Sequence, residues 1–225
     1  MYTPEHFAAD DSEALIVRLS RRWTGVLVTV APDGTPVATH LPILWDAERK
    51  IAVGHIARAN PHWKLGPGRG LIVLSGAGAY VSPNWYPSKA EHGKAVPTWN
   101  YEAVHLSGRV DWFDDPARLE SVVRGLSDLH EAGQAKPWQV EDAPRAYIGA
   151  MLRGIVGVEL HAEHIEAKRK LSQNKNAADF AGVVAGLSAS DDPGAREMAV
   201  LMGEAVRDLG PPASSPATGG STCET

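Results

Sequence analysis

The feature that most constrains the fold is a series of short β-branched and apolar segments separated by turn residues. Residues 24–30 form one such segment, and residues 37–45 resume it after Pro32-Asp33-Gly34. These turn residues supply the backbone conformations of a tight turn, so the two segments are predicted to form a hairpin. Residues 46–49 are a second turn before a third strand at 50–56. Strands joined in this way favour an antiparallel sheet.

The same pattern continues along the chain. Further strands are predicted at residues 71–74, 79–82, 104–113 and 154–160. Helices are predicted at 10–22, 115–130, 143–152, 176–187 and 195–209, and Asn60-Pro61 is predicted to begin a further short helix. Asp10 and Glu13 have the spacing of a capping box for the first helix. Because the helices are collected at the edges of the strand series, we predict an α+β fold built on an antiparallel barrel.

Domain boundaries follow from this order of elements. Residues 1–170 are predicted to form the barrel with its inserted helices, and residues 171–209 a C-terminal helical segment packed on it. Residues 210–225 are rich in Pro, Ser, Gly and Thr, which cannot bury a core, so this tail is predicted to be disordered.

Composition narrows the class of protein. The formal net charge is −5, which excludes nucleic-acid binding through a global basic field but leaves a local basic patch open. The single cysteine, Cys223, cannot form an intrachain disulfide, which is typical of a reducing compartment. No secretory signal and no membrane-spanning apolar run are expected. These features predict a soluble, cytoplasmic protein.

The segment from Tyr80 to Tyr101 holds five of the fifteen aromatic residues of the chain. It reads Y-V-S-P-N-W-Y and, ten residues later, V-P-T-W-N-Y, so Trp and Tyr alternate with hydroxyl, amide and proline residues. A segment that only filled a core would use Leu, Val and Ile. Aromatic rings beside polar side chains instead indicate a wall that stacks on a flat, partly polar ligand.

A second group of candidate residues lies where a strand enters a helix, in G-H-I-A-R-A-N-P-H-W. Arg58 supplies a planar cation and Asn60 caps the helix, so together they suit a phosphate group. The alternative is a surface arginine beside an ordinary cap. In A-T-H-L-P, Pro42 indicates an edge or broken strand whose free backbone groups can bind a ligand. His40 in this segment is either a ligand contact or a core histidine.

The remaining motifs give weaker indications of a binding or catalytic site. The glycine-rich segments at 66–70 and 76–79 match no phosphate-binding loop and are predicted to be turns. His161 and His164 have no evident third ligand, so no metal site is expected, and no nucleophile motif supports hydrolysis. K-R-K-L-S-Q-N-K (168–175) is either a solvated basic loop, a nucleic-acid contact or a contact to a ligand phosphate.

Taken in order, seven segments resemble the PaiB-like family of FMN-binding negative transcriptional regulators. They are M-Y-T-P-E-H-F, A-T-H-L-P, G-H-I-A-R-A-N-P-H-W, Y-V-S-P-N-W-Y-P-S-K, V-P-T-W-N-Y-E-A-V-H, G-I-V-G-V-E and K-L-S-Q-N-K, spread over residues 1–208. The resemblance implies an FMN-binding split barrel with peripheral and C-terminal helices. It also implies a homodimer with the flavin near the subunit interface.

The resemblance also suggests roles for particular residues. Those near the phosphate would be Arg58, Asn60 and Lys175, and those along the ring edge Thr39, His40 and Leu41. The ring walls would be Trp85, Trp99 and Tyr101, while Ser172, Gln173 and Asn174 would close the site from the same chain or from its partner.

Three functions remain open at this point. The first is a flavin-dependent regulator or sensor, and the second is an oxidoreductase that uses NADH or NADPH on a small substrate. The second needs no further acid or base, because the flavin itself carries the electrons. The third is a binding module for another planar ligand such as haem. Direct DNA binding has no support from charge or from a helix-turn-helix motif.

Overall fold

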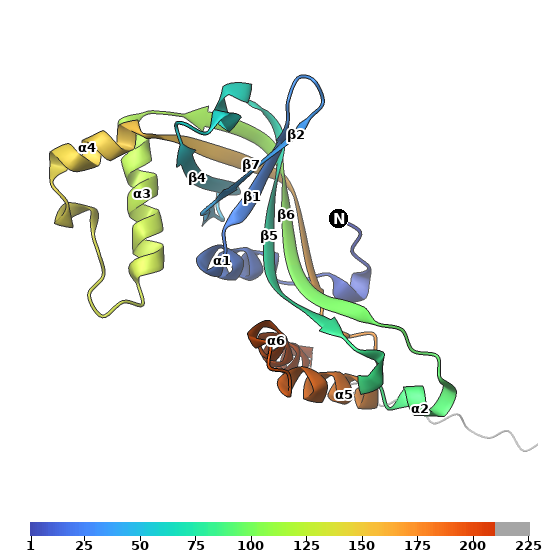
Figure 1. Ribbon diagram of the computed structural model, residues 1–225. Coiled ribbons are helices and arrows are strands. Elements are labelled where there is room, and N and C mark those ends of the chain that lie inside the picture. The colour runs from blue at the N-terminus through green and yellow to red at the C-terminus, as the bar shows by residue number, and fades with distance from the viewer. Residues whose placement is uncertain (210–225) are drawn as a thin grey trace, which may run out of the picture.

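Seven strands form one antiparallel sheet in the computed structural model, which describes residues 1–209 (Figure 1). The strands are β1 (Gly25–Val30), β2 (Pro36–Leu41), β3 (Leu44–Asp46), β4 (Ile51–Ala57), β5 (Gly68–Val81), β6 (Thr98–Phe113) and β7 (Ile155–Lys170). Their order is β2-β1-β5-β6-β7-β4-β3. The sheet curls until β2 contacts β4, but no ladder joins these two strands. The predicted α+β fold with a split antiparallel barrel is confirmed.

Three strands are much longer than the sequence analysis indicated. β5 has 14 residues, and β6 and β7 have 16 each. One end of each strand belongs to the barrel, and the other end continues as a three-stranded arm towards α2 in Figure 1. One option for residues 168–170 was a solvated loop. These residues are instead the end of β7 and pair with β6.

The prediction of turns in the two glycine-rich segments, 66–70 and 76–79, is wrong because most of these residues lie within β5. A Cβ atom on Gly70 would lie 2.5 Å from Cγ2 of Val110 on the next strand. A β-bulge shifts the pairing of β5 with β6 between Ser75 and Gly78. Glycine therefore permits close packing and a bulge here, which the local sequence does not distinguish from a turn.

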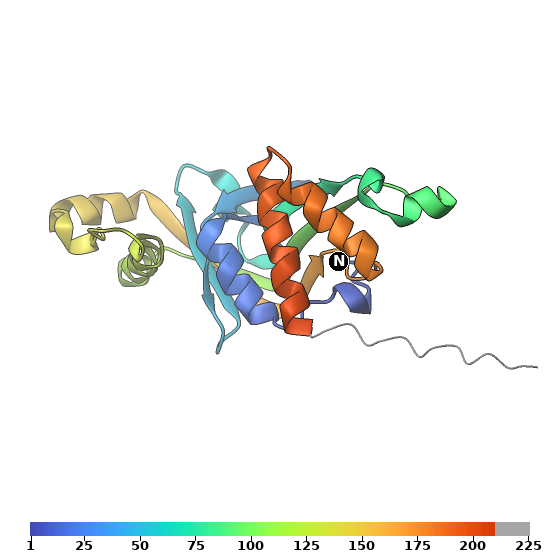
Figure 2. The same ribbon diagram turned by 90° about the horizontal axis from the view of Figure 1, so that it is seen from below.

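The helices are α1 (Ser12–Arg22), α2 (Ser88–His92), α3 (Pro116–Glu131), α4 (Arg145–Arg153), α5 (Ala177–Ser188) and α6 (Pro193–Leu209). Asp11, and not Asp10 as expected, caps α1 by accepting a hydrogen bond from the Ala14 amide at 2.9 Å. Asp115 caps α3 as predicted, with the Arg118 amide 2.8 Å from its carboxylate. Figure 2, which views the molecule from below, shows α1 and α6 side by side in front of the sheet, while α3 and α4 project from the end of the molecule away from α2.

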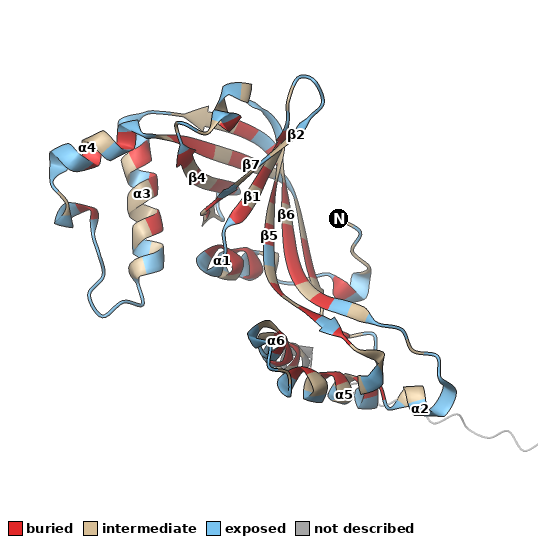
Figure 3. Ribbon diagram, viewed as in Figure 1, coloured by how far each residue is buried: buried red, intermediate tan, exposed pale blue. Residues whose placement is uncertain are grey.

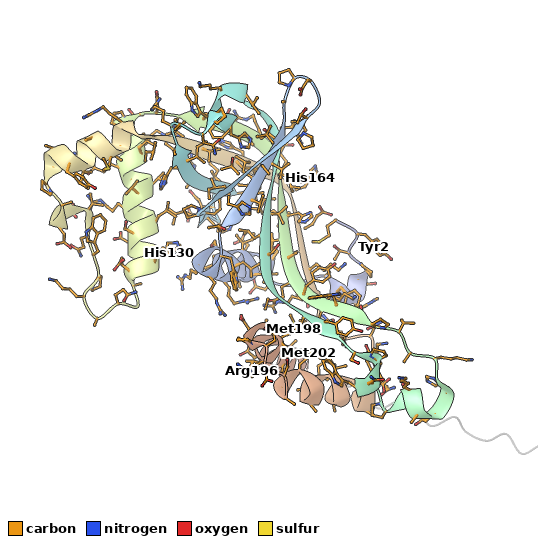
Figure 4. The ribbon with its side chains drawn as sticks, in the orientation of Figure 1. Tyr2, His130, His164, Arg196, Met198 and Met202 are labelled. Atoms are coloured by element: carbon orange, nitrogen blue, oxygen red, sulfur yellow. The ribbon has the colours of Figure 1, made fainter. Side chains whose placement is uncertain are left out.

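Buried side chains form three separate clusters (Figure 3). The barrel core packs Leu19 of α1 against the inside of the sheet, where Leu106 is also fully buried. The arm core lies between the long strands and the C-terminal helices, with Met198 and Met202 of α6 facing the sheet (Figure 4). The third cluster joins α3 to α4 around Leu119. The arm thus has a hydrophobic core of its own, which it shares with the C-terminal helices.

A buried charged group lies between the barrel core and the arm core. Glu102 of β6 has a fully buried side chain, and its Oε1 accepts a hydrogen bond from Arg18 Nη2 at 2.6 Å. Arg169 Nε lies 3.1 Å from the same oxygen. The second carboxylate oxygen has no hydrogen-bond partner. Charge pairing therefore connects α1, β6 and β7 where the two cores meet.

The remaining predictions about organisation are tested only in part. Among the described helices, none is long and apolar enough to cross a membrane. The division into a barrel of residues 1–170 and a helical segment of residues 171–209 stays a prediction. The tail predicted to be disordered, residues 210–225, lies outside the described residues.

Candidate functional site

A hydrogen-bonded group of polar side chains lies where the edge strand β2 meets the turn after β4. Asn60 Nδ2 donates to Thr39 Oγ1 at 3.1 Å, and Thr39 Oγ1 lies 2.8 Å from His62 Nδ1. His62 Nε2 lies 2.8 Å from Thr29 Oγ1. We call these four residues the Thr39 cluster. Asn60 also caps the 3-10 helix Pro61–Leu65, as predicted, by accepting from the His62 amide at 3.0 Å.

The sequence analysis did not select Thr29 or His62 of this cluster, and the bonds of both threonines meet at His62. Its side chain is only 1% exposed, and the Trp112 ring lies 5.5 Å away. Burial lowers the pKa of His62 from its ordinary value of 6.5, so the ring is neutral at pH 7. The segment N-P-H-W contains this residue, but its threonine partners come from two other strands. Only the fold brings them together.

β2 contributes backbone as well as side chains to this region. As an edge strand, it has backbone N–H and C=O groups on its outer side that no strand ladder pairs. Leu41 is 1% exposed and lies in the barrel core. His40 is exposed, and its side chain points to the face of the sheet opposite Thr39. These two residues can offer backbone groups to a ligand at Thr39, whereas their side chains lie elsewhere.

Arg58, the predicted phosphate contact, is held by backbone oxygens. Its Nε donates to the Arg153 carbonyl at 2.9 Å and its Nη2 to the Ile155 carbonyl at 3.1 Å. Its Nη1 lies 3.6 Å from an oxygen of Asp114. The guanidinium thus tethers the C-terminal end of α4 and borders a cavity of about 550 Å³. It is not part of the Thr39 cluster, although it lies only two residues from Asn60.

Trp85, a predicted ring wall, packs against α5. A Cβ atom on Gly186 would lie 2.3 Å from Cδ2 of the Trp85 ring, and one on Gly182 would lie 2.0 Å from its backbone oxygen. These two glycines, four residues apart on one face of the helix, form the surface on which Trp85 rests. In this structure Trp85 fixes the tip of the arm to the C-terminal helices.

The other two predicted walls lie on the outer face of the arm. Trp99 is 56% exposed and meets Tyr80 of β5 edge to face, with ring centroids 6.2 Å apart. Tyr101 lies two residues further along β6, on the same face, and Lys168 Nζ lies 5.2 Å from its ring centroid. The arm therefore carries an aromatic surface made of the exposed Tyr80 and Trp99 and the half-buried Tyr101. Lys168 is buried beside it, and its Nζ donates to the Tyr2 carbonyl at 3.0 Å.

Residues 172–175 connect the arm to α5. Ser172 is buried and bonds the side chain of Asn100. The Gln173 side chain accepts from the Leu171 amide and donates to the carbonyl of Arg169 in β7. Lys175 Nζ lies 4.6 Å from the Tyr86 ring centroid, while Asn174 is exposed. The K-L-S-Q-N-K segment thus stabilises the junction of the arm with the helices.

The next residue, Asn176, caps α5 and links two of the segments that carry the family resemblance. Its Nδ2 bonds the buried Asp179, which also accepts from the amide and hydroxyl of Ser88 at 3.0 and 2.7 Å. The hydrogen bond from the Ser88 hydroxyl is the main cause that lowers the pKa of Asp179. The segment Y-P-S-K is therefore anchored on the helix that follows K-L-S-Q-N-K.

The predicted site residues of one chain therefore lie on two separate surfaces. Thr39 pairs with Leu27 of β1, which pairs with Ile72 of β5, and Ile72 pairs with Leu106 of β6. Thr39 and Leu106 therefore lie at the same level of the sheet. Tyr101 lies five residues further along β6, which is about 17 Å at 3.3 Å per residue. The Thr39 cluster also faces the barrel interior, while Trp99 and Tyr101 face outward.

Comparison with known proteins now identifies the family. A model described as "Putative FMN-binding domain" matches residues 1–164. The chain belongs to this FMN-binding domain family. "Protease synthase and sporulation protein PAI 2" of Bacillus subtilis is 32% identical over 206 residues, which is 90% of this chain and 96% of that protein. The resemblance to the PaiB-like family is confirmed.

Solved structures share the fold of this FMN-binding domain protein. The flavocytochrome Anf3 from Azotobacter vinelandii has a TM-score of 0.53 at 15% identity, covering 78% of this chain and 75% of that chain. The FAD and heme binding protein from Mycobacterium smegmatis has a TM-score of 0.53 at 14% identity, covering 83% and 94%. At these identities the likeness concerns the fold alone.

The donors of the Thr39 cluster fit the polar edge of a flavin. Asn60 Nδ2 carries two hydrogens, of which one goes to Thr39, so the other is available. The unpaired backbone of β2 adds further donors and acceptors. A flavin ring presents carbonyl oxygens and ring nitrogens that such groups can bind. The predicted ring walls Trp99 and Tyr101 lie on the second surface.

Proposed function

We propose that this FMN-binding domain protein binds FMN at the Thr39 cluster and acts as a flavin-dependent regulator or sensor. The observation that carries this proposal is the cluster itself, in which Asn60 keeps a spare donor beside an unpaired strand edge. Bound FMN would supply redox chemistry, while the chain's own residues hold the ring edge and exclude water. The name of the Bacillus subtilis relative refers to protease synthesis and sporulation, which supports a regulatory role.

We further propose that two copies of the chain complete each site. The arm's aromatic surface lies too far along β6 to reach the Thr39 cluster of the same chain. The outer face of the sheet between them carries Val26, Val28, Leu71 and Val73, all only half-buried. A second copy packed on this apolar face would bury these side chains and bring Trp99 of one protomer towards the free edge of β2 in the other, where the backbone at Thr39 and His40 has no partner strand on its outer side.

Flavin binding is tested by the visible spectrum of the purified protein and by titration with FMN. Thr39→Val keeps the shape of the side chain but removes one hydrogen bond, which costs about 1 kcal/mol and weakens FMN binding about fivefold. Thr35→Val is the matched control, because Thr35 lies in the exposed β1–β2 turn. A colourless protein that takes up no FMN would refute the proposal.

Complementation tests the shared site. Trp99→Ala should weaken FMN binding about tenfold, through loss of roughly 1.5 kcal/mol of ring stacking. When the Thr39→Val and Trp99→Ala proteins are mixed and allowed to exchange subunits, a heterodimer gains one unaltered site if the two residues come from different chains. Half of the tight binding sites of those heterodimers should then return. No recovery after verified exchange would place both residues in a site within one chain.

The same preparation separates the other functions. A haem-type absorption band in place of flavin bands would favour the planar-ligand module. Bleaching of bound flavin by NADPH or NADH under anaerobic conditions would favour an oxidoreductase. Direct operator binding has no support from the net charge of −5, so a salt-sensitive and sequence-specific DNA shift would revise this part of the proposal.

A further inference from the structure

The His62 ring lies between two threonine hydroxyls, and both of its nitrogens are used. Nδ1 is 2.8 Å from Thr39 Oγ1, and Nε2 is 2.8 Å from Thr29 Oγ1. The ring is 1% exposed, and burial keeps it neutral. A neutral imidazole carries a single proton, so one nitrogen donates and the other accepts. The ring therefore transmits hydrogen-bond direction from one threonine to the other.

Asn60 fixes the direction of one hydrogen bond in this network. Its Oδ1 accepts from the backbone amide of His62 at 3.0 Å, so its other terminal atom is the Nδ2 amino group. That group donates to Thr39 Oγ1 at 3.1 Å. Thr39 thus always accepts one hydrogen bond from Asn60. Its second bond, to His62, is the one whose direction can change.

The two neutral forms of His62 give Thr39 opposite properties. When the proton is on Nδ1, the ring donates to Thr39, both lone pairs of Oγ1 are occupied, and the hydroxyl hydrogen is free to donate to a ligand. When the proton is on Nε2, the ring donates to Thr29 instead. Thr39 then donates to Nδ1 and keeps one lone pair free to accept from a ligand.

We propose that His62 is the positioning residue of the flavin site, and that the location of its proton sets whether Thr39 donates to or accepts from the bound ring. This inference rests on the proposed function, since it assumes FMN at the Thr39 cluster. Ring nitrogens of a flavin that accept a hydrogen bond in the oxidised form carry N–H groups in the reduced form. A hydroxyl that can reverse its polarity matches both forms, whereas a fixed donor matches only one.

Two substitutions at His62 separate positioning from stability. The amide of His62→Asn takes the place of Nδ1, so it keeps the bond to Thr39, and it can turn to donate or accept. The amide of His62→Gln reaches the place of Nε2, so it keeps Thr29 and leaves Thr39 without its partner. Both variants lose the packing of the ring against Trp112. FMN affinity and urea unfolding are measured for both.

We expect His62→Asn to bind FMN within about threefold of the unaltered protein and His62→Gln about tenfold more weakly, at similar stability. Equal affinities in the two variants, or affinities that simply follow stability, would overturn the proposal. If the unaltered protein binds no FMN, the proposed function fails first, and this outcome is distinct from binding that is insensitive to His62.

Ring ¹⁵N chemical shifts of His62 supply a readout that a structural role would not move. We expect a neutral ring, with the proton on Nδ1 beside oxidised FMN and on Nε2 beside reduced FMN. The same tautomer in both redox states, or a doubly protonated ring at pH 7, would overturn the inference.

Discussion

Replacing Gly182 by Ala should destabilise the protein, although the same change inside a helix usually stabilises it. Gly182 lies in α5, and a Cβ atom there would be 2.0 Å from the backbone oxygen of Trp85 and 3.2 Å from Cδ of Pro87. Ordinary contacts of a Cβ atom begin at 3.4 Å. The arm tip would have to retreat from the helix by more than 1 Å. Because the nearest atom is backbone, no side-chain rotation relieves the clash.

The magnitude follows from two opposing terms. Alanine is favoured over glycine in a helix by about 1 kcal/mol. Overpacking a closed contact costs about 1–3 kcal/mol, and a backbone clash belongs at the upper end of that range. We therefore expect Gly182→Ala to lower the free energy of unfolding by about 1–2 kcal/mol.

Gly203 of α6 provides the matched control, because nothing lies within 4 Å of the corresponding Cβ position. Gly203→Ala should raise the free energy of unfolding by about 1 kcal/mol. Urea unfolding followed by circular dichroism measures both variants. Midpoints that shift in the same direction by similar amounts would refute the seating of Trp85 on α5, and would leave this residue available as a ligand wall.

Three further substitutions test the buried carboxylate of Glu102, the buried histidine and the pairing of β6 with β7. Glu102→Gln should lower the free energy of unfolding by about 2–3 kcal/mol, because it leaves two partly exposed arginines, Arg18 and Arg169, without their shared carboxylate. Urea unfolding measures this change, and an unchanged midpoint would contradict this account. Since burial lowers the folded-state pKa of His62, acidification below about 6.5 protonates the unfolded chain first and removes stability, by at most about 1.4 kcal/mol per pH unit for this group. His62→Asn should flatten the dependence of stability on pH between about 6.5 and 5, and an identical slope would show that the ring is not the titrating group. A Cβ atom on Gly108 would lie 1.9 Å from a backbone oxygen of β7, so Gly108→Ala should lower the free energy of unfolding by about 3 kcal/mol and lower the melting temperature. An unchanged melting temperature would mean that β6 and β7 can move apart at this position.

Much of the fold could be predicted from local patterns. The β1–β2 hairpin follows from its turn residues, and the caps of α3 and of the 3-10 helix follow from Asp115 and Asn60. The lengths of β5, β6 and β7 could not be predicted, because glycines and charged residues interrupt the alternation that marks a strand. Those residues are tolerated since a neighbouring strand or helix, remote in sequence, packs against them.

The candidate site also combines residues that the sequence predicted with contacts that only the fold reveals. Thr39 and Asn60 lie in strings with recognisable chemistry, and the fold brings them within hydrogen-bond distance. Trp85 has the same type of side chain as Trp99, yet one is packed on α5 and the other is 56% exposed. His62 carried no signal of its own, because a buried histidine differs from a surface one only by its partners.

The sequence by itself identified the family and predicted the antiparallel pairing of the strands and a flat, partly polar ligand. These depend on residue type and on spacing over a few positions, where turn chemistry and strand propensity act. Only the tertiary structure decided which aromatic rings are exposed, that Arg58 bonds backbone carbonyls, and that His62 joins Thr29 to Thr39. Those outcomes are contacts between segments up to about a hundred residues apart. Such contacts are selected by the packing of the whole sheet and leave no periodic trace in the chain.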